Sequence, residues 1–346
     1  MSKSMQSAWL CFVIHFFVEV FCFAILANSF DLNLYQSGVL AFLYDTFAFA
    51  PQYIVGLVHE KFKRFNFNLL AVIIMLIGLI IIRKSDVLTV AAIILISLGN
   101  AILHDTCAIH TVLNSNSKLF PSAFFVSGGS FGLIIGQTFG KSEIFNVWFL
   151  LIPLIIILIL SQMLNKDLKE NRDYPRFAII NGKMPVAVIL FAAFFITFVR
   201  SFVGYAIPIG WKKELWQAFV LFFLMGFGKM LGGFLADKYG ALNVGIWSSV
   251  LCAPFLIFGD NQMVISCIGV LIFSMTMSIT FGMFLSVYNS LPGFAFGLTT
   301  IPLMLGVFPA FFITVPKTAG ILLIICTMII CAVLFGITLK RRKQNE

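Results

Sequence analysis

Charged side chains are scarce in this chain of 346 residues. Asp, Glu, Lys and Arg together make up 11% of it, whereas a typical soluble domain carries about 25%. Hydrophobic residues make up 60%, and the 41 phenylalanines are too many for a water-soluble core of this length. The scarcity of charge therefore excludes an ordinary soluble protein and indicates a chain that is embedded in a membrane.

Cysteine and histidine patterns that are typical of metal sites are also missing. The seven cysteines lie within apolar stretches, without CxxC spacing, as small core residues do. Of the four histidines, His104 and His110 are six positions apart on one predicted helix, which places them on different faces. We therefore expect no metal ion and no other cofactor.

Long polar segments are absent except for one. Apolar runs of about 20 residues, each long enough to cross roughly 30 Å of hydrocarbon, recur along the chain. Such runs must be helical, because backbone groups inside a bilayer have to be hydrogen-bonded internally. We predict an all-α integral membrane protein with twelve transmembrane helices, near residues 8–29, 35–58, 66–83, 87–113, 119–140, 144–163, 184–208, 214–236, 241–258, 262–288, 293–314 and 317–339.

The one long polar segment divides these helices into two sets of six. We expect an N-terminal six-helix bundle (1–164), a cytoplasmic linker (165–183) and a C-terminal six-helix bundle with a short basic tail (184–346). The two bundles are expected to be pseudo-symmetric.

Lysine and arginine are concentrated on one predicted side of the membrane, including the linker. By the positive-inside rule, both termini and the linker would be cytoplasmic in a multi-pass protein of the plasma (inner) membrane. The same bias, facing anionic lipid, accounts for the net charge of +9, so no nucleic-acid partner is needed.

A short pattern occurs twice, about half the chain length apart. Residues 56–62 (GLVHEKF) and 233–239 (GFLADKY) each place a glycine four positions before an acid, which a lysine and an aromatic residue follow. Two similar bundles with a charged turn after the second helix are the layout of a rocking transporter. The gating candidates are Gly233, Asp237, Lys238 and Gly240 in the second copy, and Glu60 and Lys61 in the first.

Ionisable residues within the apolar runs are the candidates for chemistry, because each costs about 2.5–3.5 kcal/mol at a helix centre. His15 and Glu19 lie four apart and share a helix face. A buried acid beside an imidazole can load a proton on one side and release it on the other. We assign proton coupling to His15, Glu19, Asp45, His104 and Asp105.

Two cations lie in the second half, Arg200 on the seventh helix and Lys229 on the eighth. Either could extend its charge to the membrane interface. In a dry cavity, Arg200 would favour a substrate with a carboxylate or phosphonate. An ion pair with Glu19 or Asp45 would explain Arg200 equally well.

Glycines recur every four residues on the predicted fifth helix, at Gly128, Gly132, Gly136 and Gly140. Such a stripe allows another helix to approach backbone to backbone. Gly293 and Gly297 stand at the start of the eleventh helix. Static packing explains these glycines, and surfaces that slide during gating would also suit them.

Residues 228–240 (GKMLGGFLADKYG) resemble the loop signature of the major facilitator superfamily. The resemblance implies two six-helix bundles. It also implies that Asp237 braces the cytoplasmic gate against the start of a neighbouring helix, which holds the outward-open state. The first copy departs from the pattern, because Glu60 replaces the aspartate and no glycine follows Phe62.

Three N-terminal segments resemble the fosmidomycin-resistance-like branch of that superfamily: 15–19 (HFFVE), 44–52 (YDTFAFAPQ) and 98–104 (LGNAILH). This chain has Glu19 where the branch usually has aspartate. We expect Tyr44, Gln52 and Asn100 to line the substrate site together with Arg200.

These observations predict a secondary active transporter that moves a small organic solute by alternating access. We expect proton coupling, anionic or amphipathic compounds as candidate substrates, a monomer in the lipid bilayer, and export rather than uptake. The alternatives are an uptake symporter, an uncoupled uniporter, and a membrane-embedded enzyme that uses His104 and Asp105 as an acid–base pair. A sensor or scaffold would be expected to carry a soluble domain.

Overall fold

The computed structural model describes residues 2–29, 34–82, 84–169 and 173–341. Part of the predicted linker (170–172) and most of the predicted basic tail (342–346) lie outside the described residues. All of the elements described are helices, apart from one isolated backbone bridge between Ile180 and Leu339.

The first half of the chain forms seven α-helices and one short 3-10 helix. They are α1 (Lys3–Ser29), α2 (Leu34–Phe49), α3 (Gln52–Lys61), α4 (Phe67–Ile81), α5 (Asp86–Leu113), α6 (Phe120–Gly140), η1 (Val147–Leu150) and α7 (Leu151–Lys169). The second half also contains seven α-helices and one short 3-10 helix. Its elements are α8 (Val186–Ala206), α9 (Leu215–Tyr239), α10 (Ala241–Phe258), α11 (Met263–Ser274), α12 (Met277–Val287), α13 (Pro292–Val307), η2 (Phe308–Phe311) and α14 (Lys317–Thr338).

The prediction of an all-α chain with twelve membrane-spanning helices is confirmed. Ten spans in the described residues are long and apolar enough to cross a membrane, and α4 and α13 are shorter apolar helices. Two predicted spans are broken in the middle. The break between α2 and α3 falls at Pro51, which has no N–H to donate.

The second break, between α11 and α12, lies where α9 passes very close. A Cβ at Gly232 would lie 2.5 Å from the carbonyl carbon of Met275. The interrupted helix and the glycine together allow the two backbones to touch.

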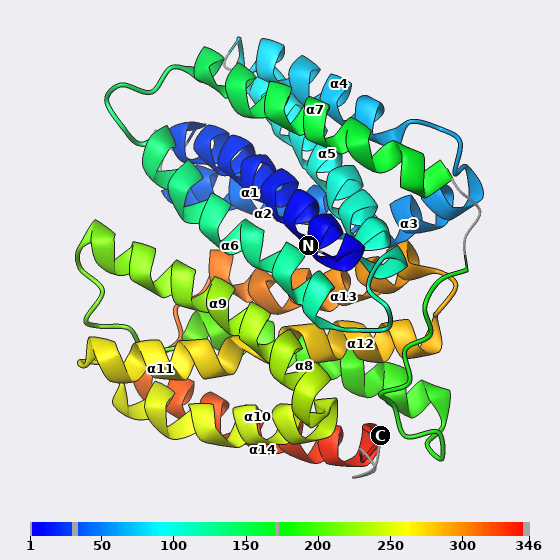
Figure 1. Ribbon diagram of the computed structural model, residues 1–346. Helices are drawn as coiled ribbons and strands as arrows, with labels where there is room; N and C mark the ends of the chain where they lie inside the picture. Colours follow the sequence, from blue (N-terminus) through cyan, green and yellow to red (C-terminus); the bar gives the residue numbers. More distant parts are fainter. Residues whose placement is uncertain (1, 30–33, 83, 170–172, 342–346) are drawn as a thin grey trace.

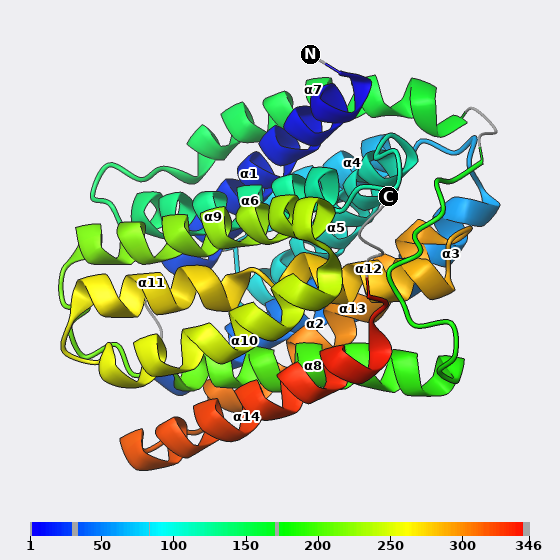
Figure 2. The ribbon, with the colours of Figure 1, turned by 60° about the horizontal axis from the view of Figure 1, so that its bottom comes forward.

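Figure 1 shows the two halves as separate groups of helices, with α1–α7 above and α8–α14 below. Helices α6 and α9 run side by side across the boundary between these groups, also in the turned view of Figure 2. The other extensive contact across the boundary is between α3 and α13. The two groups are called the N-terminal and C-terminal bundles below.

The start of α1, the end of α14 and the described part of the linker lie on one face of the molecule, the termini face. The ammonium of Lys3 lies 3.3 Å from the carboxylate of Asp167 at the end of α7. Near the C-terminus, Lys340 donates its N–H to the carbonyl of Ile179, and Asn181 donates to the carbonyl of Thr338. The linker is therefore fixed by backbone hydrogen bonds to the end of α14.

The four-residue glycine stripe of α6 packs against α1 inside the N-terminal bundle. A Cβ at Gly128 would lie 2.5 Å from the carbonyl oxygen of Phe12, and one at Gly132 would lie 2.2 Å from that of Phe16. Gly136 and Gly140 meet the carbonyls of Val20 and Ala24 in the same way. The stripe therefore holds two helices of one bundle together.

The glycines of α13 instead lie at the boundary between the bundles. A Cβ at Gly293 would lie 2.8 Å from the Cα of Gly56, and one at Gly297 would lie 2.1 Å from the backbone nitrogen of Tyr53. The α3–α13 contact is thus a direct approach of two backbones, one from each bundle.

The α1–α6 contact generates a stability prediction. Gly132→Ala should lower the melting temperature, because the new methyl would overlap a backbone oxygen that cannot rotate away; overpacking of this kind costs about 1–3 kcal/mol. Gly182→Ala, at a linker glycine whose Cβ would meet nothing within 4 Å, is the matched control. Thermal unfolding of both purified variants checks this, and equal melting temperatures would contradict it.

Candidate functional site

A buried carboxylate, Glu19 of α1, lies at the centre of the N-terminal bundle. Its Oε1 lies 3.2 Å from Nε2 of His104 and 3.5 Å from Nε2 of His15. The side-chain amide of Asn100 donates to the same oxygen at 3.3 Å. All four side chains are buried. The structure therefore brings together four of the predicted site residues, His15, Glu19, Asn100 and His104, which are called the Glu19 cluster below.

Two glycines of α6 make room for this cluster. A Cβ at Gly129 would lie 2.4 Å from Nε2 of His15, and one at Gly132 would lie 2.9 Å from the Cβ of Glu19. Larger residues at either position would push α1 away from α6.

Outer contacts fix the orientation of the polar groups. Nδ1 of His15 lies 3.1 Å from the carbonyl oxygen of Phe125. Because a carbonyl can only accept, this Nδ1 carries the hydrogen, and Nε2 is left to face Glu19. The rings of His15 and His104 meet edge to face with centroids 4.1 Å apart. Asn100 also donates to the hydroxyl of Tyr44, another predicted site residue.

The Glu19 cluster also has the geometry of a metal site. The ligand atoms of His15, Glu19 and His104 all lie within 4.8 Å of one another. The three residues were predicted together for proton coupling, but a metal site was not expected, because only the spacing of His104 and His110 was weighed for one. The approach of α1 to α5 cannot be inferred from spacing along a single helix.

The two aspartates of the predicted proton-coupling set lie outside the cluster. Asp45 is half-buried on α2, and the described residues contain no ion pair with it. Asp105 is fully buried but faces α13: a Cβ at Gly293 would lie 2.8 and 2.9 Å from its two carboxylate oxygens. Neither oxygen has a hydrogen-bond partner among the described residues. Asp105 therefore belongs to the boundary between the bundles.

Two of the predicted substrate-binding residues also have other surroundings. The side-chain amide of Gln52 donates to the carbonyl of Ala48 on the preceding turn. The guanidinium of Arg200 is buried in the C-terminal bundle, 4.0 Å from the centroid of the Phe273 ring, which is a cation–π contact. In the described part of the chain, no acid forms an ion pair with Arg200.

Lys229 of α9 is the cation that reaches the boundary between the bundles. Its ammonium donates to the hydroxyl of Ser130 on α6 at 2.8 Å. From the sequence, Lys229 stood out as a cation within an apolar run, with extension to the membrane interface as its explanation, and it was left out of the predicted site. Its place on the helix that carries the signature loop is the signal that points to the boundary.

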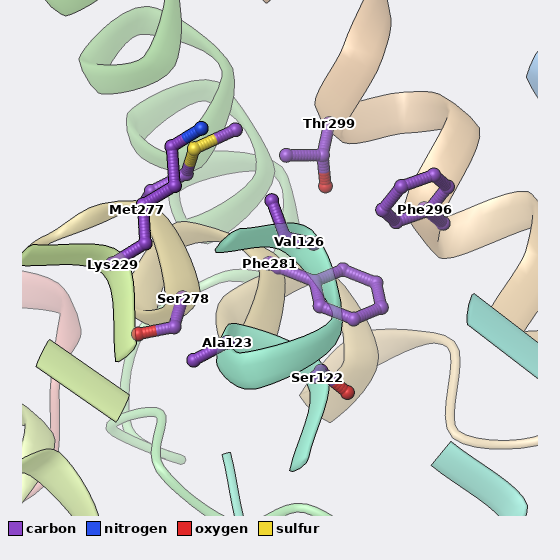
Figure 3. A pocket seen from close by; sticks show the side chains of 9 residues that line it. All are labelled: Ser122, Ala123, Val126, Lys229, Met277, Ser278, Phe281, Phe296 and Thr299. Carbon is purple, nitrogen blue, oxygen red and sulfur yellow. The ribbon is translucent and has the colours of Figure 1, made fainter. Parts of the chain in front are cut away.

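A small cavity lies beside Lys229, lined by residues of α6, α9, α12 and α13 (Figure 3). Its volume is about 20 Å³, and one water molecule needs about 10–15 Å³. The hydroxyls of Ser122 and Ser278 line it and have no protein partner among the described residues. This cavity is therefore large enough for one water molecule and too small for an organic solute, so the bundles are closed around it.

On the termini face, Asp237 connects the end of α9 to the start of α6. Its two carboxylate oxygens accept the backbone N–H groups of Leu119 at 2.8 Å and Phe120 at 2.9 Å. The first N–H groups of a helix have no partner within the helix, and they carry the positive end of its dipole. This contact links the two bundles and is called the Asp237 latch below.

The other predicted gating residues of the second copy surround this latch. Gly233 meets α6, since a Cβ there would lie 2.5 Å from the Cβ of Ala123. Gly240 has φ 90°, a conformation that favours glycine, and it turns the chain from α9 into α10. The ammonium of Lys238 lies 5.1 Å from the ring centroid of Tyr239.

The first copy makes a different contact. Glu60 accepts a hydrogen bond from the hydroxyl of Tyr174 in the linker at 3.0 Å, and Lys63 lies 4.0 Å away. Burial raises the pKa of the Tyr174 phenol, and the carboxylate of Glu60 adds to the effect. The ammonium of Lys61 lies 5.5 Å from the ring centroid of Phe62. Glu60 thus bonds to the linker rather than to a helix start.

No known family model and no curated protein sequence matches this chain. Solved structures match over nearly its whole length. A major facilitator superfamily transporter, FucP, in the outward conformation shares 12% identity at a TM-score of 0.63, covering 95% of this chain and 97% of that one. The E. coli fucose:proton symporter FucP, in a variant form, shares 13% at 0.66, covering 97% and 98%.

The human organic anion transporter MFSD10 (TETRAN) shares 12% identity at a TM-score of 0.68, covering 97% of this chain and 100% of that one. Identities this low establish the fold alone. The chain is a multi-pass membrane protein with the fold of the major facilitator superfamily transporters.

Proposed function

We propose that this protein is a secondary active transporter that carries a small organic solute across the membrane by alternating access, coupled to protons through the Glu19 cluster. The observation that carries the proposal is the placement of Glu19. A carboxylate within a membrane-spanning helix costs about 2.5–3.5 kcal/mol, and here it is surrounded by two imidazoles and an amide. Such a group is expected at a proton pathway.

The arrangement of the two histidines supports this role. The Nδ1 of His15 is occupied by the carbonyl of Phe125, so only Nε2 can exchange a proton with Glu19. The Nε2 of His104 lies on the same carboxylate oxygen. A proton that arrives on any of the three groups can be passed to either of the others without leaving the cluster.

The Asp237 latch supports alternating access. It holds α9 against α6 on the termini face, and the bundles have to release it before they can separate there. The basic linker argues that the termini face is cytoplasmic, in a plasma (inner) membrane. With the termini face in the cytoplasm, the structure in which the Asp237 latch is formed is the conformation that is closed to the cytoplasm.

The proposed substrate is a small organic solute, with organic anions as the first class to test. Lys229 lines the cavity between the bundles and is better placed than Arg200 to meet an anionic group there. The similarity to a proton symporter and to an organic anion transporter is in keeping with both parts of the proposal. Resemblance to the fosmidomycin-resistance-like branch favours export, and uptake is the alternative that a transport assay separates.

The geometry does not support the alternative of a membrane-embedded enzyme that uses His104 and Asp105 as an acid–base pair. His104 points to Glu19, whereas the carboxylate of its neighbour Asp105 lies against Gly293 of α13. An acid–base pair would need both side chains to meet one substrate atom. The fold is also that of transporters.

The first functional prediction concerns coupling. In proteoliposomes with an imposed pH gradient, Glu19→Gln should abolish gradient-driven accumulation of the substrate, because an amide cannot take up and release a proton. Exchange of labelled for unlabelled substrate should persist, since it needs no net proton movement. Organic anions, sugars and lipophilic drugs form the test panel, with gradients of both directions. The matched control is Glu143→Gln, on an exposed residue between α6 and η1.

If Glu19→Gln accumulates substrate as well as the parent protein does, Glu19 does not couple transport to protons. Transport of no compound on the panel by the folded parent protein would count against the proposed function itself.

The second functional prediction concerns the latch. Asp237→Asn should leave one oxygen to accept an N–H, while its NH₂ group faces the other donor. Hydrogen bonds to a charged group contribute about 1.5–3 kcal/mol. The population of the closed state relative to the open state should therefore fall roughly tenfold, and turnover should fall. Initial transport rates and melting temperatures measure both effects. Asp173→Asn, on an exposed linker residue, is the control; unchanged turnover in Asp237→Asn would mean that the latch does not gate transport.

A further inference from the structure

Three possible ligand atoms in the Glu19 cluster lie within 4.8 Å of one another. Oε1 of Glu19 lies 3.2 Å from Nε2 of His104 and 3.5 Å from Nε2 of His15. Zinc ligands lie about 2.0–2.1 Å from the metal in a tetrahedral site, which places neighbouring ligand atoms about 3.3 Å apart. Two edges of such a tetrahedron are therefore already present in the structure.

The surroundings of His15 are those of a metal ligand, whereas Nδ1 of His104 has no hydrogen-bond partner among the described residues. In metal sites, a ligating histidine almost always donates its other ring N–H to a carbonyl or a carboxylate. His15 does so, to the carbonyl of Phe125 at 3.1 Å. The amide of Asn100 holds the ligating oxygen of Glu19. The three ligands come from two helices, α1 and α5, that pack directly on each other.

The donor set selects the type of ion. Two imidazoles and one carboxylate suit zinc and similar transition metals, whereas magnesium and calcium prefer oxygen ligands. Three protein ligands leave the fourth tetrahedral position for water or another small ligand.

The cluster lies close to the boundary between the bundles. The ring of Phe125 contacts a residue on each side, with its centroid 5.1 Å from the ring of His15 and 5.9 Å from the ring of Phe296. Phe296 belongs to α13 and lines the central cavity (Figure 3). When the bundles separate, Phe296 leaves with the C-terminal bundle, and one aromatic ring remains in front of the cluster.

We propose that His15, Glu19 and His104 form a binding site for a zinc-like transition-metal ion within the N-terminal bundle. The inference goes beyond the proposed function and depends only on the geometry of the cluster. Since the ion would occupy the same three atoms as the transported proton, bound zinc should inhibit proton-coupled transport.

Metal binding can be measured directly on the full-length protein in nanodiscs, without any gradient. All variants carry Cys326→Ser, because Cys326 is an exposed thiol that could bind zinc adventitiously. Titration calorimetry should show one Zn²⁺ per chain and no binding of Mg²⁺. Co²⁺ in the same site should give the visible absorption bands of tetrahedral cobalt.

Loss of a ligand should weaken the site. Glu19→Gln and His104→Gln should each lower the Zn²⁺ affinity at least tenfold, a loss that even second-layer changes around metals can reach. His59→Gln and His110→Gln are the matched controls, because these two histidines lie outside the cluster and should leave binding unchanged. If His104→Gln does not fold, Glu19→Gln carries the test.

Absence of Zn²⁺ binding by the parent protein, or unchanged affinity in the ligand variants, would overturn the metal site. Loss of binding in a control variant would do the same by placing the ion elsewhere. These outcomes are separable from the failure of the transport proposal. Zinc binding without gradient-driven accumulation would contradict only the coupling, and coupling without zinc binding would contradict only the metal site.

Discussion

The close approach of α1 to α6 is the contact on which the site depends. Hydrocarbon supplies no hydrophobic drive for helices to associate, so membrane helices rely on close packing of small residues. Here the glycines of α6 meet backbone carbonyls of α1, from Phe12 to Ala24. The same approach lets His15 reach the carbonyl of Phe125 and leaves room for its ring beside Gly129. The close packing of α1 against α6 therefore also places the polar side chains of the site.

The two copies of the repeated pattern act differently, and the reason lies in the helices that they face. Asp237 binds the N–H groups of Leu119 and Phe120, at the N-cap and first position of α6. The corresponding start of α13 is Leu291 followed by Pro292. Proline has no N–H, and the N–H of Leu291 is bonded to the carbonyl of Tyr288. An acid of the first copy would find no such pair of donors.

Hydropathy was sufficient for the twelve spans, because a membrane helix has to be apolar along its whole length. The breaks at Pro51 and near Met275 were not predicted, since the apolar pattern continues across both. Within the site, the pairing of His15 with Glu19 followed from their spacing on one helix. The contact between His104 and Glu19 depends on how α5 is aligned against α1. The sequence pattern of a single helix does not contain that alignment. The same limit applies to Asp105, whose position next to His104 in sequence does not make it a neighbour of Glu19.

Charge is distributed unequally between the bundles, and this bears on how they could move. The buried acids Glu19 and Asp105 belong to the N-terminal bundle, and the cations Arg200 and Lys229 belong to the C-terminal bundle. In the described residues, no ion pair joins these two sets. Lys229 instead crosses to the neutral hydroxyl of Ser130.

Removing one partner from a buried ion pair costs about 3–5 kcal/mol, whereas a typical hydrogen bond contributes about 0.5–1.5 kcal/mol and one to a charged group about 1.5–3. For the proposed rocking motion, separating the bundles at Lys229 breaks one hydrogen bond from a charged donor and not an ion pair, so neither side is left as an unpaired buried acid. The Asp237 latch, at the edge of the interface, adds two hydrogen bonds to one carboxylate, and these also have to break on opening.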